Sequence, residues 1–135
     1  MSSEKELTTL PVAPLKLVVM QSCAELGKKV DDYIVQFRRK AHNEHKEGIE
    51  FKGYLEDSYI IDSVCPRFGT GEAKGQLLDS VRGTDLYILT DVCNHSITYD
   101  VFGHTNYMSP DNHFQDLKRI IAAAGSHCKS ITVIM

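Results

Sequence analysis

Three short apolar runs constrain the fold of this chain more than any other feature of the sequence. They occupy Leu15–Met20, Leu86–Thr90 and Ser130–Met135. Short runs rich in Leu, Val and Ile are typical of strands that are buried on both faces, as in a parallel sheet. Parallel strands need long crossover connections, which are usually helical. The sequence therefore predicts an α/β fold with a mainly parallel sheet flanked by helices.

Two helices are predicted between these strands. In the first, Ser22 and Glu25 match a capping box, and basic residues at 38–40 suit the C-terminal end. Its face toward the sheet is predicted to consist of Leu26, Val30, Tyr33, Ile34 and Phe37. The second is predicted to begin at Ser109–Pro110 and to end near Gly125. Its inner face is predicted to consist of Phe114, Leu117, Ile120, Ile121 and Ala124.

A β-hairpin is predicted between the first helix and the second apolar run. Residues 59–64 and 75–78 flank the sequence Phe68-Gly69-Thr70-Gly71-Glu72, in which two glycines permit a sharp turn. Residues 41–53 and the segment from 91 to 107 are polar and are predicted to be loops. We expect residues 1–14 to be an extended arm and residues 15–135 to be one α/β domain. A buried strand at the very end of the chain is more typical of an incomplete domain than of a natural end.

Composition and charge exclude several classes of function. The 18 acidic and 15 basic residues give a net charge of -3, whereas a nucleic-acid partner calls for clustered Lys and Arg. No apolar run approaches the roughly 20 residues of a membrane span, and no signal peptide is recognisable. The four cysteines lack zinc-site spacing and are expected to be reduced and mostly buried. We therefore expect a cytoplasmic protein that binds neither nucleic acid nor a membrane.

Two turns carry candidate binding residues. Phe68 at the hairpin tip could stack on a flat ring while Glu72 accepts a hydrogen bond from an exocyclic amine, which would suit adenine; a plain glycine turn is the alternative. A P-loop is disfavoured because its Lys-Ser/Thr pair is absent. Ser80 and Arg82 precede a buried strand and could jointly hold a phosphate, although their position alone favours an ordinary turn.

No metal site or nucleophile is predicted. The six histidines form no i, i+4 pair and are expected to be exposed to solvent. Cys93 and His95 are close in sequence, yet no third catalytic partner is identifiable. Asp31 and Asp32 are expected on a solvated helix surface.

The two turns also carry a family resemblance. Arg67-Phe68-Gly69-Thr70-Gly71-Glu72 and the sequence Asp-Ser-Val-Arg-Gly-Thr-Asp-Leu at 79–86 resemble the N-terminal half of ribose-phosphate pyrophosphokinases. That family has Arg-Phe-Ser-Asp/Asn-Gly/Gln-Glu followed by Glu-Ser-Val-Arg-Gly-x-Asp-Val. The similarity extends to the segment at 111–114 and to the last strand, so that it covers about residues 15–135. Thr70 stands where the family has Asp or Asn, and the segments at 42–53 and 93–110 also differ.

The resemblance implies an activity and roles for single residues. Family members transfer the diphosphoryl group of Mg-ATP to ribose 5-phosphate, giving phosphoribosyl diphosphate and AMP, and they act as oligomers. It implies that Phe68 stacks on the adenine of ATP, that Thr70 and Glu72 hydrogen-bond it, and that the hairpin reaches into the site of a neighbouring subunit. It also implies that Ser80 and Arg82 hold phosphate at a regulatory site.

Other parts of the family's machinery have no counterpart in this sequence. These are the basic ATP loop, the metal-binding His and the Asp-rich pentose-phosphate loop. We therefore expect the chain to be the N-terminal part of such an enzyme, with no catalytic residue and no metal ligand of its own, and to be inactive alone. One alternative is a non-catalytic regulatory or oligomerisation module of the same family. Another is a free-standing nucleotide-binding module, which would bind ATP without a partner chain.

Overall fold

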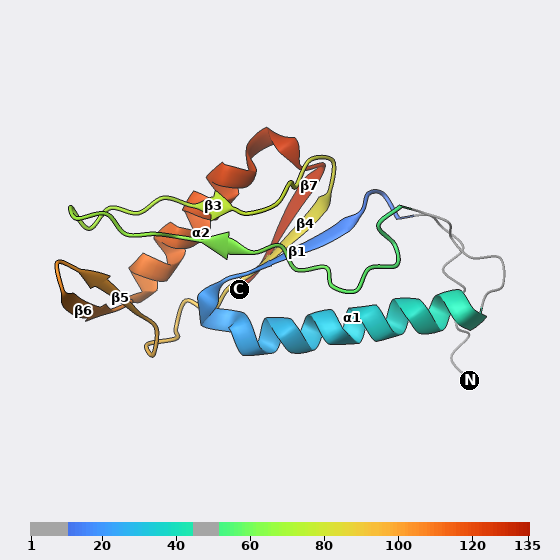
Figure 1. Ribbon diagram of the computed structural model, residues 1–135, viewed down its shortest axis with the longest axis horizontal. Helices are drawn as coiled ribbons and strands as arrows, with labels where there is room; N and C mark the ends of the chain where they lie inside the picture. Colours follow the sequence, from blue (N-terminus) through green and yellow to red (C-terminus); the bar gives the residue numbers. More distant parts are fainter. Residues whose placement is uncertain (1–10, 45–51) are drawn as a thin grey trace.

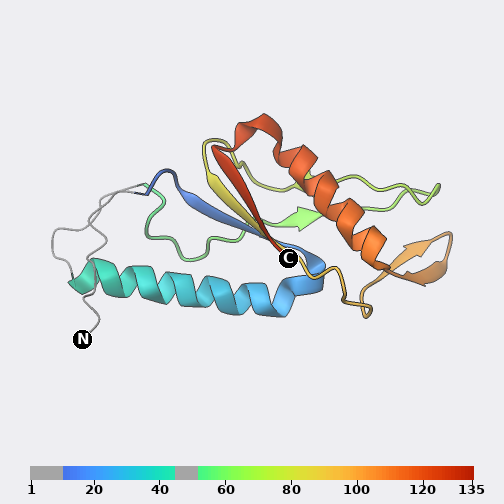
Figure 2. The ribbon, with the colours of Figure 1, turned by 180° about the vertical axis from the view of Figure 1, so that it is seen from behind.

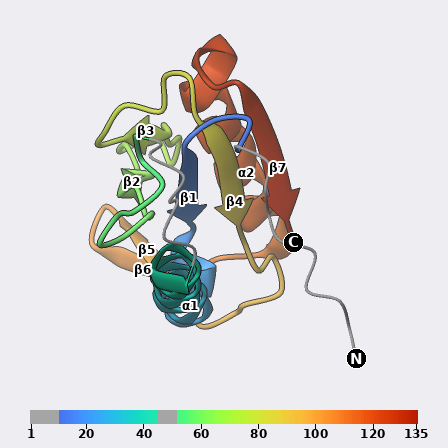
Figure 3. The ribbon, with the colours of Figure 1, turned by 90° about the vertical axis from the view of Figure 1, so that its right-hand side faces the viewer.

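Three parallel strands form the centre of the molecule, as the computed structural model shows for residues 11–44 and 52–135 (Figure 1). They are β1 (Leu15–Val19), β4 (Asp85–Leu89) and β7 (Ser130–Ile134), in the order β1-β4-β7. Leu86 and Ile88 of the central strand are completely buried. Both faces of the sheet are covered, one by the first long helix and the other by the second, which lies beside a β-hairpin (Figure 3). The predicted fold class is therefore confirmed.

The first helix begins differently from the prediction. A short 3-10 turn, η1 (Gln21–Cys23), precedes α1 (Ala24–Glu44). The predicted capping box is wrong, because Ser22 lies inside η1 and its Oγ accepts a hydrogen bond from the backbone N–H of Asp91, 3.0 Å away. The hydroxyl therefore ties the end of β4 to the start of the helix.

The predicted inner face of α1 is only partly correct. Val30 and Ile34 pack against the sheet, but Leu26, Tyr33 and Phe37 are 58%, 70% and 49% exposed. The reason is a rotation of the helix that turns Gly27, Asp31 and Val35 inward. A Cβ on Gly27 would lie only 2.2 Å from the side chain of Val19, so this glycine permits the close approach of α1 to β1.

Asp31 is buried, and the prediction of a solvated position is wrong. Its carboxylate accepts hydrogen bonds from the backbone N–H of Tyr59 and the hydroxyl of Ser58, both at 2.7 Å. Residues 59–61 continue alongside β1, where the N–H of Leu17 donates to Tyr59 and the N–H of Ile61 donates to Leu17. The helix thus fixes the segment that leads into the hairpin.

The predicted hairpin is confirmed. Its strands are β2 (Ser63–Val64) and β3 (Gln76–Leu77), which pair antiparallel, and it packs along α2 (Pro110–Ala124) (Figure 2). A Cβ on Gly75 would lie 2.5 Å from the backbone of Arg119, so the absence of a side chain lets the hairpin approach that helix closely.

The predicted loop between residues 91 and 107 contains a second hairpin, and that prediction is wrong in part. It consists of β5 (Thr98–Val101) and β6 (His104–Tyr107). Phe102 and Gly103 form the turn, and both have positive φ angles, 51° and 75°. Alternation of polar and apolar residues is present only in the four residues of β5, whereas β6 is exposed along its whole length and lacks it.

The end of the fold mixes confirmed and corrected predictions. Ser109 caps α2 by accepting from the N–H of Asn112, as predicted, and Gly125 ends the helix and begins η2 (Gly125–His127). Phe114 points outward, 45% exposed, with the Lys118 ammonium 4.9 Å from its ring centre. Strand β7 is mostly exposed rather than buried, since it forms an edge of the sheet.

Two predicted segments lie partly outside the described residues. Residues 1–10 of the predicted arm and residues 45–51 of the predicted loop belong to this part. Within the described part, α1 continues to Glu44, Ala13 is buried, and the carbonyl of Pro14 accepts from the N–H of Asp85. The end of the arm therefore lies against the sheet.

Candidate functional site

The first hairpin presents the three predicted adenine-contacting residues on one tight turn. The N–H of Phe68 donates to the carbonyl of Glu72 at 2.7 Å, and the N–H of Gly71 donates back to Phe68 at 2.8 Å. Gly71 has a φ of 83°, a conformation that few other residues adopt. Phe68 is 47% exposed, and Thr70 and Glu72 are also exposed. The turn therefore offers an aromatic ring, a hydroxyl and a carboxylate to a ligand.

A buried ion pair fixes the base of this turn. The Arg67 guanidinium donates two hydrogen bonds to the Asp116 carboxylate on α2, at 2.8 and 2.9 Å, and both side chains are buried. Arg119 also donates to Asp116 at 2.7 Å. On its other side, the Arg67 guanidinium carbon lies 4.8 Å from the centre of the Tyr99 ring, in the second hairpin. The residue before Phe68 is thus held by two neighbouring elements.

Sequence analysis did not identify this ion pair as part of the site. The signal available was weak, because Arg67 and Asp116 are 49 positions apart. Asp116 does stand beside Leu117 and one turn before Ile120, which are two residues of the predicted inner face of the helix. A carboxylate on a buried helix face requires a partner, and the basic residue at the end of the hairpin was a candidate.

Ser80 and Arg82 lie in the connection from β3 to β4, away from the hairpin tip. Figures 1 and 2 show this connection and the tip at opposite ends of the hairpin. Both residues are exposed, and the hydroxyl of Ser80 accepts from the backbone N–H of Arg82 at 3.3 Å. The guanidinium of Arg82 has no hydrogen bond within the described part of the chain. The three residues of the hairpin turn and the Ser80–Arg82 pair therefore lie on separate surfaces.

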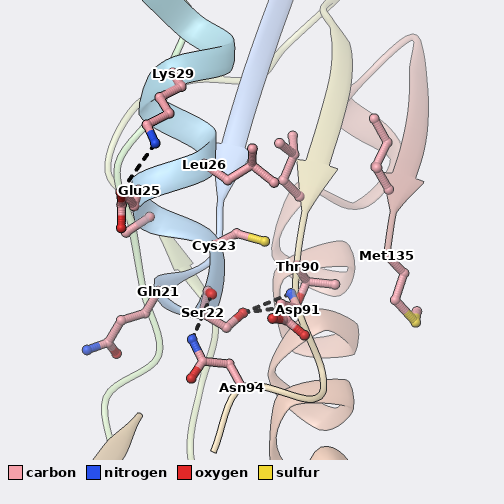
Figure 4. Close-up of a pocket in the computed structure, with 13 residues that line it drawn as sticks. Gln21, Ser22, Cys23, Glu25, Leu26, Lys29, Thr90, Asp91, Asn94 and Met135 are labelled. Carbon is pink, nitrogen blue, oxygen red and sulfur yellow. Dashed lines mark hydrogen bonds and ion pairs between the residues drawn. The ribbon is translucent and has the colours of Figure 1, made fainter. Parts of the chain in front are cut away.

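A pocket of about 680 Å³, not anticipated from the sequence, opens at the carboxyl ends of the parallel strands (Figure 4). Open α/β sheets bind ligands at this edge. The Oγ of Ser22 lies 3.5 Å from the hydroxyl of Thr90, and the side-chain amide of Asn94 donates to the carbonyl of Ser22 at 3.0 Å. Three charged residues also line it: Lys29, which pairs with Glu25 at 3.3 Å, and Asp91. The pocket thus combines these polar groups with the apolar strand ends at Leu89 and Ile134.

The thiols near these features are poor nucleophiles. Burial, with a smaller contribution from the Asp91 carboxylate, raises the pKa of Cys23 beside the pocket. Burial and the Asp116 carboxylate raise the pKa of Cys65, on the hairpin, to about 11. A thiol attacks as its thiolate, so both residues are weakly reactive at neutral pH. The cysteines are free, and the prediction that most are buried is wrong: three are partly buried and Cys93 is exposed.

Histidines and acidic residues do not gather into a metal centre in the part of the chain that the structure describes. His113 contradicts the prediction of solvent exposure, because it is 4% exposed and its Nε2 lies 2.7 Å from the carbonyl oxygen of Asn94. This contact ties the start of α2 to the segment that follows β4. Across residues 11–44 and 52–135, no helix is long and apolar enough to cross a membrane.

Comparison with known proteins agrees with the resemblance found in the turns. The family model described as the N-terminal domain of ribose phosphate pyrophosphokinase matches residues 15–135. A search of the curated proteins finds no match. The family match includes the exposed aromatic turn, the Arg67–Asp116 pair and the Ser80–Arg82 connection. The chain belongs to the family of the N-terminal domain of ribose phosphate pyrophosphokinase.

Proposed function

We propose that this chain is the nucleotide-contacting N-terminal part of an enzyme that makes phosphoribosyl diphosphate. The reaction moves the diphosphoryl group of Mg-ATP to the 1-hydroxyl of ribose 5-phosphate and releases AMP. The observation that carries the proposal is the aromatic turn at 68–72, which is exposed for a ligand yet fixed at its base by a buried ion pair. The chain's membership of the pyrophosphokinase family supports the proposed class of enzyme.

The roles proposed for the turn follow from its chemistry. The ring of Phe68 stacks on adenine, and such base–aromatic contacts contribute about 1–3 kcal/mol. The carboxylate of Glu72 accepts a hydrogen bond from the exocyclic amine, because an ionised carboxylate is an acceptor only. The Thr70 hydroxyl can donate to or accept from a ring nitrogen. The proposal places these contacts in the site of a neighbouring subunit, since the turn projects from the body (Figure 1).

Magnesium enters this proposal with the nucleotide. Among the described residues, no three His, Cys, Asp or Glu side chains gather at one place, and Mg²⁺ is commonly bound through substrate phosphates. What the chain contributes is the position of the base. We propose that diphosphoryl transfer needs the family's basic and Asp-rich loops, which residues 15–135 do not contain, and that this chain alone does not turn over.

Arg82 is the proposed contact for a regulatory phosphate. Its guanidinium is exposed, and a guanidinium suits phosphate because it is permanently positive and carries N–H donors. Ser80 supplies a hydroxyl two residues away, which already accepts from the backbone of the turn and keeps its proton for donation.

A homo-oligomer in the cytoplasm is the proposed working form. Its support in this chain is the outward face of α1, where Leu26, Tyr33 and Phe37 are exposed at helical spacing. Apolar side chains gathered on one face favour an interface over solvent. A second copy of the chain is the occupant we propose for this face.

Titration of Mg-ATP into the purified chain, followed by calorimetry, tests the proposed nucleotide site. Phe68→Ala is expected to weaken ATP binding by about 5- to 100-fold, as loss of one base–aromatic stack should. Phe114→Ala is the matched control, because Phe114 is 45% exposed against 47% for Phe68. Equal ATP affinity of the wild type and Phe68→Ala would refute the proposed site.

A separate assay tests the activity proposed for the parent enzyme and the inactivity of the chain. The purified chain is incubated with Mg-ATP and ribose 5-phosphate, and AMP release is followed by chromatography. No release is expected. AMP formation that persists in a preparation free of other enzymes, and that is lost with Phe68→Ala, would show that this chain is active by itself.

A further inference from the structure

The second hairpin, β5–β6, lies beside the tip of the first hairpin. Figures 1 and 2 show the two hairpins projecting from the same end of the molecule. They differ in how they meet the body, because β2–β3 packs on α2 whereas β6 is exposed along its length. A segment with so little burial gains little stability from its own position.

Two contacts join the second hairpin to the residues on either side of Phe68. Before it, Arg67 stacks on Tyr99 at 4.8 Å. After it, Gly69 meets Phe102: a Cβ placed on Gly69 would lie 3.1 Å from the ring carbon Cζ of Phe102. The Phe102 ring therefore lies against the backbone of Gly69, next to the residue proposed to stack on adenine.

Phe102 is an unusual residue for its position. It is 82% exposed, so core packing does not account for a large apolar side chain there. Its φ of 51° is in the left-handed region, where Asn, Asp and Gly are the preferred turn residues. Backbone strain of this kind is found preferentially at binding sites, where an exposed side chain is held for a ligand.

We propose that Phe102 is a second aromatic contact for the nucleotide base, so that a purine is held by rings from both hairpin tips. The inference rests on the proposed function of Phe68. A planar purine has two faces and apolar edges, and aromatic rings can engage both. The second hairpin thereby extends the base site beyond the turn at 68–72.

Binding measurements on three variants of Phe102 test this assignment. Phe102→Ala and Phe102→Leu are expected to weaken Mg-ATP binding by about 5- to 100-fold, and Phe102→Tyr is expected to retain it, because only Tyr keeps the ring. Magnesium tripolyphosphate, which has no base, should bind all four proteins equally. Tyr107→Ala is the control, since Tyr107 is a 72% exposed aromatic in the same hairpin.

The other outcomes separate this inference from the proposed function. If Phe68→Ala loses ATP affinity while Phe102→Ala keeps it, the inference fails and the proposed function stands. If Phe102→Leu binds as the wild type does while Phe102→Ala does not, the ring only supports Gly69 and the base contact is refuted. If the wild-type chain does not bind ATP, or Phe68→Ala binds it equally well, both fail. Circular dichroism of each variant checks that the fold is retained.

Discussion

The turn at residues 68–72 and the turn at residues 79–84 are both exposed, but they are anchored by different means. The first is held from outside by side chains, through Arg67 to Asp116 on α2 and to Tyr99 on the second hairpin. Within the described part of the chain, the second has no ion pair at its base: Val81 is buried in the core, and the N–H of Gly83 donates to the carbonyl of His127 at 2.8 Å. The Arg82 guanidinium has no ion pair with the residues that the structure describes.

This difference matches what each turn is proposed to bind. Aromatic stacking depends on the distance and tilt of two rings, so the ring must be held in one orientation. Attraction between a guanidinium and a phosphate falls off slowly with distance and tolerates movement. The turn at 68–72, which is held by the Arg67–Asp116 ion pair, therefore suits a base. The turn at 79–84, which carries a charged side chain without an ion pair to the described residues, suits a phosphate.

Removal of the Arg67–Asp116 ion pair should lower the free energy of unfolding more than any other change. Asp116→Ala leaves the buried guanidinium of Arg67 without its carboxylate, which typically costs about 3–5 kcal/mol. Urea unfolding followed by circular dichroism measures this loss. Asp57→Ala is the control, because it removes an ion pair from a fully exposed carboxylate and should leave stability unchanged. Similar unfolding curves for the two variants would mean that the ion pair does not hold the turn.

Filling the contact between the first hairpin and α2 should have the next largest effect. Gly75→Ala places a Cβ 2.5 Å from the backbone of Arg119, and overpacking of this kind costs about 1–3 kcal/mol. Ser80→Ala, in the other turn, should change the free energy of unfolding by less than about 0.5 kcal/mol. Thermal unfolding compares the two, and a smaller loss for Gly75→Ala than for Ser80→Ala would contradict the structure.

The two turns should also respond differently to conservative substitution. Phe68→Leu is expected to lose most of the ATP affinity, because it keeps the apolar volume and removes the ring. Arg82→Lys should retain the binding of inorganic phosphate, while Arg82→Ala lowers it by up to about fivefold, as an exposed ion pair contributes about 0.2–1 kcal/mol. Calorimetry with each ligand measures both. Loss of phosphate binding in Arg82→Lys would show that this turn needs fixed geometry after all.

The effect that is smallest at neutral pH concerns Cys65, two residues before Arg67. Because its folded pKa is raised to about 11, the folded state keeps the thiol proton longer than the unfolded state does. The free energy of unfolding should be unaffected by this thiol below pH 9 and should fall as pH rises toward 11. Cys65→Ala should remove that decline in urea unfolding. Iodoacetamide at pH 8 should modify the exposed Cys93 before Cys65.

The sheet and the start of α2 could be predicted from the sequence, because apolar runs and a Ser-Pro cap are local signals. The rotation of α1 could not, since Leu26 and Phe37 satisfy the same periodicity as the residues that face the sheet. The deciding feature was Gly27, whose missing side chain lets β1 approach. The periodicity of apolar residues along a helix does not indicate which helix face packs closest to the neighbouring strand.

For the candidate site, the sequence indicated the contacting residues of both turns but not what holds them. The Arg67–Asp116 ion pair joins positions far apart in the chain, so it depends on how α2 packs on the hairpin. The second hairpin was missed because its strands are only four residues long and β6 is fully exposed. Its sequence signals are the alternation of polar and apolar residues over Thr98–Val101 and Gly103 at the turn.

The most direct test of the nucleotide site is a nuclear Overhauser spectrum of the chain with saturating Mg-ATP. Our account predicts cross-peaks between the adenine H2 or H8 proton and the ring protons of Phe68, and no adenine contact with the connection that carries Arg82. Adenine cross-peaks to that connection alone, or bound ATP without any contact to Phe68, would contradict it.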